Sequence, residues 1–218
     1  MKFKKTAALL TAAAIVALAG PATAVPPWVV TVGTQTSGHV SFSANATSWV
    51  NFVAAGPSGP VALSCGAAGA VGSIYPGTYP YGQAVAKIDG TVWSSCVGPG
   101  WAFNIYQTPG YSWNLNLTGL SGPIWNGFIN NIQARVKSTV PGACEFNLYG
   151  RMNLTFDTAQ VGGGSTFTQT LNINQPNHIP NLTISGVTGC AGLFWNGNSM
   201  GVNATYQLHN PVGLVGIS

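Results

Sequence analysis

The sequence predicts an all-β protein, a disulfide-stapled antiparallel β-sandwich or barrel. Three observations support this fold class. No stretch beyond the first 24 residues shows a sustained helical period, whereas period-two alternation of apolar and polar residues recurs along the chain. Short runs of this kind are separated by turns rich in Gly, Pro and Asn, as in sandwiches and barrels. The chain also holds four cysteines, an even number that favours paired bridges.

The first 24 residues predict a secretory signal peptide. Three lysines precede an apolar run of small residues, and an Ala-Thr-Ala step at positions 22–24 matches a cleavage site. The apolar run is too short to cross a bilayer, so we expect no membrane span in the mature chain. Residues 25–218 then form one secreted β-domain, extracellular or associated with the cell surface.

The clearest strand pattern is "CEFNLYGRMNLTF", residues 144–156. Successive side chains of a strand point to opposite faces, so alternation marks a half-buried strand with one wet face. Gly150 interrupts the pattern and predicts a bulge or bend. One face collects the apolar residues of this stretch, namely Cys144, Phe146, Leu148, Met152, Leu154 and Phe156.

The same reasoning predicts about ten strands in all. They lie within residues 28–34, 39–53, 61–72, 84–93, 101–107, 111–118, 127–138, 144–156, 165–174, 181–187 and 201–208. In the stretch 111–118, Trp113, Leu115 and Leu117 share one face, and Phe167, Leu171 and Ile173 do so in the stretch 165–174.

The cysteines fall in phase with apolar neighbours, which predicts that all four sulfurs face the core. The sets that share a parity are Val61, Leu63 and Cys65; Ile88, Val92 and Cys96; Cys144, Phe146 and Leu148; and Leu182, Ile184 and Cys190. Inward cysteines act as structural staples and not as exposed redox switches. A zinc site would need close cysteine pairs, and the nearest spacing here is 31 residues.

A similarity between two segments of the sequence predicts a duplicated unit. "KIDGTVWSSCVG" (87–98) resembles "NLTISGVTGCAG" (181–192), and each follows an earlier cysteine on an upstream strand. Duplication favours the pairs Cys65–Cys96 and Cys144–Cys190, although four cysteines allow three connectivities.

The mature chain is almost uncharged. Its bases are Lys87, Arg135, Lys137 and Arg151 and its acids are Asp89, Glu145 and Asp157. This composition leaves no basic patch for nucleic acid and no acidic cluster for calcium. A neutral, polar surface does not repel copies of itself, which favours self-association. The alternative is a neutral secreted protein that stays monomeric.

The motif G-x-S-x-G at residues 197–201 raises the possibility of a nucleophilic Ser199. A nucleophile elbow needs a strand, a sharp turn and a helix, with an acid and a histidine later in the chain. Only His209 follows, no acid does, and the region predicts strand, turn and strand. His39, His178 and His209 also lack the spacing of metal ligands. The sequence therefore predicts no enzyme, no catalytic residue, no metal and no cofactor.

The seven tryptophans are the remaining candidates for binding. Trp125 and Trp195 each precede an asparagine beside turn signals, so we expect them to be exposed. Aromatic plates flanked by amides hold sugar rings or apolar ligands. Cell-wall polysaccharide and an apolar molecule are the ligands that this hypothesis names.

The spacing of the cysteines and glycines resembles that of a family of small secreted four-cysteine β-proteins of actinobacteria, whose function is unknown. The segments that carry the resemblance are "ALSC", "GTVWSSCVG", "YSWNLNLTG", "GACEF" and "GVTGCAGLFWNGNSMGVNATYQL", between Leu63 and Leu208. The chain is more remotely similar to the pseudomonad protein described as an activator of alkane oxidation. The resemblance implies an extracellular β-protein with two disulfides and supplies no catalytic residue.

These observations predict a secreted, non-enzymatic cell-surface or extracellular-matrix protein that self-associates into a coat, fibre or adhesin-like layer. The segment 25–43 could donate a strand to another copy. The alternative is an extracellular binding module for carbohydrate or an apolar ligand. A hydrolase that uses Ser199 and His209 ranks below both.

Overall fold

The computed structural model describes residues 27–56, 58–121, 124–159, 167–179, 181–210 and 213–218. The signal peptide expected at residues 1–24 lies outside this part of the chain. The elements in chain order are β1 (Trp28–Val32), β2 (Val40–Ala46), β3 (Val50–Gly56), β4 (Gly59–Ile74), β5 (Gly77–Tyr79), β6 (Ala84–Gly98), β7 (Trp101–Gln107), β8 (Trp113–Ser121), β9 (Ile124–Ser138), β10 (Cys144–Asp157), β11 (Phe167–Gln175), β12 (Leu182–Gly189), the 3₁₀ turn η1 (Cys190–Gly192), β13 (Met200–Asn210) and β14 (Val215–Ile217).

The all-β prediction is confirmed. Within the described residues the only helical element is η1, and every pairing between named strands is antiparallel. The described chain contains no apolar helix of membrane-spanning length. The short strands β5 and β14 were not predicted, because three-residue strands leave too few positions for alternation to register.

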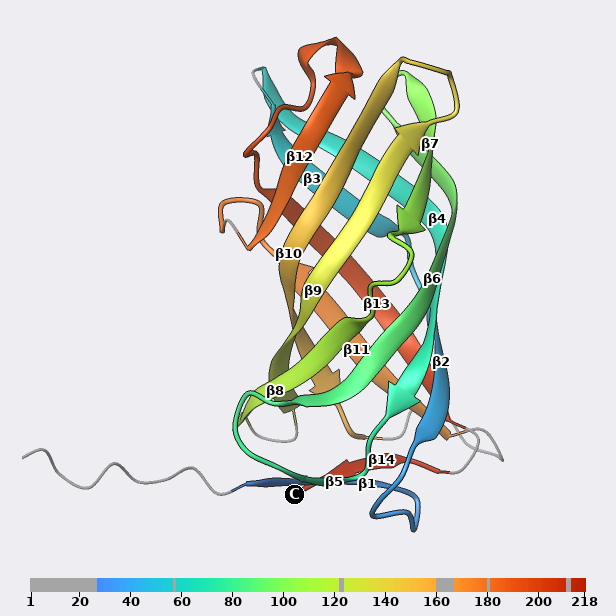
Figure 1. Ribbon diagram of the computed structural model, residues 1–218, viewed down its shortest axis with the longest axis vertical. Helices are drawn as coiled ribbons and strands as arrows, with labels where there is room; N and C mark the ends of the chain where they lie inside the picture. Colours follow the sequence, from blue (N-terminus) through green and yellow to red (C-terminus); the bar gives the residue numbers. More distant parts are fainter. Residues whose placement is uncertain (1–26, 57, 122–123, 160–166, 180, 211–212) are drawn as a thin grey trace, which may run out of the picture.

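The main sheet closes on itself. β2 and β3 both pair with β4 and β13, so they form one interrupted strand of the ring. β7 and β8 likewise share β6 and β9, and β11 and β12 share β10. Counted in this way, the described strands make an eight-membered ring in chain order, and β13 returns to β2 and β3 (Figure 1). Of the two predicted architectures, the pairing gives the barrel.

A second, three-stranded sheet closes one end of the barrel. It has the order β14-β1-β5 and lies across the base in Figure 1. Val30, Val32 and Val215 of this sheet are buried, and Trp28 meets Trp125 of β9 edge to face with ring centroids 4.7 Å apart. β1 therefore already has two partner strands within its own chain.

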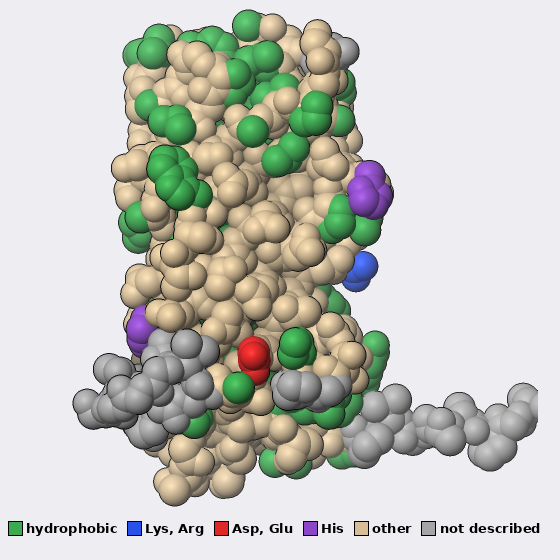
Figure 2. Space-filling view, turned by 180° about the vertical axis from the view of Figure 1, so that it is seen from behind, with side chains coloured by type: hydrophobic (Ala, Val, Ile, Leu, Met, Phe, Trp, Pro, Cys, Tyr) green, Lys and Arg blue, Asp and Glu red, His purple; other side chains and the backbone are tan. Residues whose placement is uncertain are grey.

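Alternation along the ring strands builds the interior. The six apolar residues predicted to share a face of residues 144–156 are all buried, and the polar residues between them are not. Gly150 has a left-handed φ of 128°, and the β9–β10 register shifts just after it, so the predicted bulge is confirmed. The outer faces are polar and nearly uncharged, and the side seen in Figure 2 carries few Lys, Arg, Asp or Glu side chains.

Both expected disulfides are present and buried. Cys65 of β4 pairs with Cys96 of β6, and Cys144 of β10 pairs with Cys190. Cys190 lies in η1 with a φ of 63°, outside the predicted strand, and its sulfur is nevertheless buried as predicted. Left-handed backbone from Gly189 to Gly192 ends β12 at this point. The bridges join the second ring strand to the third and the sixth to the seventh, a spacing that suits the predicted duplication.

Gly150 provides a test of the bulge. A Cβ atom at this position would collide with the Asn181 carbonyl oxygen, whereas one at Gly119 would meet no heavy atom within 4 Å. We expect Gly150→Ala to lower the free energy of unfolding by about 2–4 kcal/mol. Gly119→Ala, the matched control, should change it by less than about 0.5 kcal/mol. Urea unfolding followed by circular dichroism measures both, and equal effects would contradict this account of the bulge.

Candidate ligand cavity

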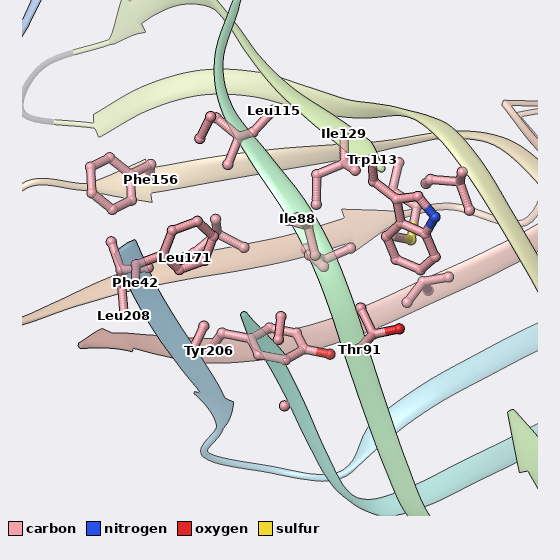
Figure 3. A pocket seen from close by; sticks show the side chains of 18 of the residues that line it. Phe42, Ile88, Thr91, Trp113, Leu115, Ile129, Phe156, Leu171, Tyr206 and Leu208 are labelled. Carbon is pink, nitrogen blue, oxygen red and sulfur yellow. The ribbon is translucent and has the colours of Figure 1, made fainter. Parts of the chain in front are cut away.

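The inward side chains of the barrel enclose a cavity of about 100 Å³. Its wall is contributed by almost every strand of the ring and by the capping sheet. The side chains labelled in Figure 3 show its apolar character: Phe42, Ile88, Leu115, Ile129, Phe156, Leu171 and Leu208. Protein interiors rarely leave voids larger than a water molecule, so this space is a specific feature of the barrel.

Several inward side chains retain partial exposure, which indicates that the interior is incompletely filled. Leu115, Leu171 and Tyr206 line the cavity and pack against the core, yet none is fully buried. Ala70 of β4 also lines the cavity, and its short side chain leaves room there. The space therefore arises from side-chain size on one wall of the closed ring.

The cavity wall carries no charge in the part of the chain that the structure describes. Its polar groups are the hydroxyls of Thr91 and Tyr206 and the indole N–H groups of Trp93 and Trp113. Burial raises the pKa of Tyr206 to about 12, and the nearby Trp93 indole opposes this only in part. The phenol is therefore neutral at physiological pH.

A reversal of alternation within β6 places Thr91 and Trp93 on the inner face. Asp89 is an extra residue relative to β4, because Val71 pairs with Gly90 and Gly72 with Ile88. The bulge turns Val92 outward, where its side chain is 71% exposed. The predicted common face of Ile88, Val92 and Cys96 is thus wrong for Val92.

A second irregularity restores the inward direction at Cys96. Ser95 has a φ of 52°, and the pairing of β6 with β7 shifts by one residue between Val92 and Cys96. Thr91 and Trp93 therefore occupy a short inverted segment between two bulges. Bulges that redirect a side chain are typical of functional sites.

Several polar atoms near this segment lack hydrogen-bond partners. Thr91 Oγ1, Trp113 Nε1 and Gln107 Oε1 are buried and make no hydrogen bond, whereas the Trp93 indole bonds with the Tyr206 hydroxyl. A buried polar group without a partner costs about 1–3 kcal/mol, so such groups are normally satisfied. Of these residues, Thr91 and Trp113 line the cavity and Gln107 does not.

The two tryptophans predicted as a ligand platform lie apart. Trp125 is 3% exposed and packs on Trp28 beneath the capping sheet, so its predicted exposure is wrong. Trp195 is 40% exposed and lies in the loop between η1 and β13. Trp125 was predicted to be exposed because it stands beside turn residues. Its contact with Trp28 of β1 joins segments far apart in the sequence, so no local pattern indicates it.

The residues of the G-x-S-x-G motif do not meet the histidine that follows them. Ser199 forms a bridge with Thr183 just before β13, and His209 lies near the far end of that strand. At about 3.3 Å per residue, the two positions are roughly 33 Å apart. The described chain has no helix after the motif, and it holds no cluster of three or more His, Cys, Asp or Glu suited to a metal ion.

The three carboxylates have local partners. Glu145 accepts a hydrogen bond of 2.6 Å from Arg135 Nε and lies 3.9 Å from Lys137 Nζ. Asp89 accepts a hydrogen bond of 2.8 Å from Ser112 Oγ, and Asp157 accepts one of 2.9 Å from the Ala159 N–H. Glu145 and Asp157 lie at opposite ends of β10, and Asp89 lies on β6, so no two of them come together as a catalytic pair.

Comparison with models of protein families, with curated proteins and with solved structures finds no match to this chain. The resemblance to the actinobacterial four-cysteine family therefore stays a prediction. The cavity is the feature on which a functional proposal can be built.

The pH dependence of stability tests whether Tyr206 is buried in the cavity wall. Because its pKa is about 12 in the folded protein and about 10 in an unfolded chain, unfolding releases its proton between these values. The unfolded state then binds fewer protons, so stability is complete below pH 10 and falls as the pH rises towards 12. We expect the wild type to lose about 2–3 kcal/mol more than Tyr206→Phe over this interval. Urea unfolding at a series of pH values measures the difference, and parallel curves would contradict the enclosure of Tyr206.

Proposed function

We propose that the barrel binds a small, neutral, largely apolar molecule in its central cavity. The observation that carries this proposal is the uncharged cavity of about 100 Å³ inside a closed ring, with apolar side chains over most of its wall. Eight-stranded barrels have interiors wide enough to hold one small ligand.

The size of the space limits the ligand. Pockets for drug-sized molecules span about 300–1,000 Å³, whereas an engineered cavity of about 150 Å³ binds benzene. A ligand here is therefore no larger than a single ring or a chain of a few carbons. Burial of a surface of that size at about 25 cal/mol per Å² gives dissociation constants of roughly 0.1–1 mM after the costs of association.

The absence of charge on the described wall favours a neutral ligand. A carboxylate or ammonium group would lose its hydration without gaining a counter-charge. Two buried disulfides further support the proposal that the protein works outside the cell, where such bonds persist.

Benzene is a suitable probe for the cavity. At ten times its dissociation constant, we expect it to raise the melting temperature by about 3–5 °C, because it binds only the folded state. Ala70→Leu, which fills the cavity, should abolish the shift. Ala62→Leu, on an exposed position of the same strand, should retain it. A shift that survives Ala70→Leu would place benzene elsewhere and refute the proposal.

Self-association is a second candidate function, and the outer face of β4, β6 and β7 favours it. Val71, Val92 and Tyr106 are 53%, 71% and 52% exposed, and Val92 pairs directly with Tyr106. We propose that copies meet through this outer apolar face. Among the described strands of the ring, β12 alone pairs with a strand on one side only, so contact between faces is favoured over strand addition.

Val92→Glu tests this second candidate. We expect the change to shift multimers to monomers in sedimentation velocity, because it places a charge at the centre of the contact. Ser94→Glu, which is exposed on the same strand, should leave the distribution unchanged. Wild-type protein that sediments as a monomer at high micromolar concentration would exclude self-association.

A further inference from the structure

We infer that the capping sheet is the gate through which a ligand enters the cavity, and that the side chain of Gln169 holds this gate closed. The inference rests on the proposed function, because it concerns access to the same cavity. It adds the route of entry and the residue that sets the rates of entry and release.

The end of the barrel that carries the disulfides is blocked by a packed layer of side chains. Leu63, Phe103, Phe146 and Ile184 are buried there, and none of them belongs to the cavity wall. The two disulfides brace the strands that carry this layer. A ligand therefore finds no route to the cavity through that end of the described barrel.

The cavity extends to the other end, where the capping sheet forms part of its wall. Val30 of β1 and both Val215 and Ile217 of β14 line the cavity. Figure 1 shows this sheet across the base of the barrel. Movement of the capping sheet would therefore open the cavity and leave the pairing of the ring intact.

The capping sheet shares few polar contacts with the ring. It is a separate sheet, and none of its strands pairs with a described strand of the ring. Among the described residues, the hydrogen bonds that join its strands to ring strands are those of Gln169 in β11. The remaining contacts are apolar packing, such as the edge-to-face contact between Trp28 and Trp125.

Gln169 satisfies the backbone at the outer edge of β14. This strand pairs with β1 on one side only, so the polar groups of its other edge need a different partner. Gln169 Nε2 donates a hydrogen bond of 2.8 Å to the Val215 carbonyl oxygen, and Gln169 Oε1 accepts one of 2.8 Å from the Val215 N–H. The same Nε2 donates one of 2.9 Å to the Thr158 carbonyl oxygen, so the amide ties the capping sheet to the ring.

The burial of this contact makes it costly to break. Gln169 is 2% exposed and Val215 is 5% exposed, so opening separates polar groups that no water reaches in the closed state. The Gln169 side chain lies outside the cavity wall and so does not contact the ligand. Its removal should therefore act on the gate and not on the affinity of the cavity.

Gln175 of the same strand is the matched control. It is also 2% exposed, and its amide bonds with the Pro176 and Ile179 carbonyl oxygens and the Asn153 N–H. At about 3.3 Å per residue, it lies roughly 20 Å along β11 from Gln169. Loss of either amide removes a similar set of buried hydrogen bonds, but only Gln169 holds the capping sheet.

The test follows the exchange of benzene into and out of the full, disulfide-bonded protein by NMR. We expect Gln169→Met to raise the rates of binding and release together by about five- to tenfold and to leave the dissociation constant within about twofold. Gln175→Met should lose a similar amount of stability in urea and change neither rate by more than about twofold.

Two further measurements do not depend on the folding of Gln169→Met. Trp28→Leu, which weakens the contact with Trp125, should raise both benzene rates by about two- to threefold. In the wild type, the Val215 N–H should exchange with deuterium faster than the N–H groups that pair β9 with β10, because the capping sheet opens without unfolding of the ring.

The outcomes separate this inference from the proposed function. If benzene binds and Gln169→Met changes its rates no more than Gln175→Met does, the gate is refuted and the cavity stands as a binding site. Should Gln169→Met not fold, unchanged rates in Trp28→Leu would overturn the gate in the same way. If benzene binds neither the wild type nor the variants, the proposed function fails and the gate fails with it.

Discussion

Closure of the main sheet into a ring leaves its inward side chains as almost the sole filling of the interior. Every described strand of the ring except β12 has a partner on both sides, so most backbone groups are satisfied without a covering layer of helices. The interior volume is then set by strand number and side-chain size. Because Ala70 contributes only a methyl group to the wall, this constraint yields a cavity and not a solid core. The capping sheet closes one end of the same space.

Much of the fold follows from alternation in the sequence. The buried face of residues 144–156, the inward cysteines at 65 and 144 and the bend at Gly150 are all local patterns, which period-two reasoning detects. Pairing between β13 and the β2–β3 pair is not local, and no residue type marks it. The choice between sandwich and barrel therefore required the structure.

The cavity could not be predicted from the sequence for a related reason. Strict alternation assigns Val92 to the core and Thr91 and Trp93 to the surface, and the bulges at Asp89 and Ser95 invert all three. Asp89 next to Gly90 was the available signal, since a polar residue beside a glycine within an apolar strand suggests a bulge.

The two ends of the barrel are held by different chemistry. The capping sheet of β14, β1 and β5 closes one end by backbone pairing and by the Trp28–Trp125 contact. Both disulfides lie in the other half, where β3, β7 and β12 complete the ring. Reduction of the two bridges would therefore loosen one end of the barrel and leave the capped end intact.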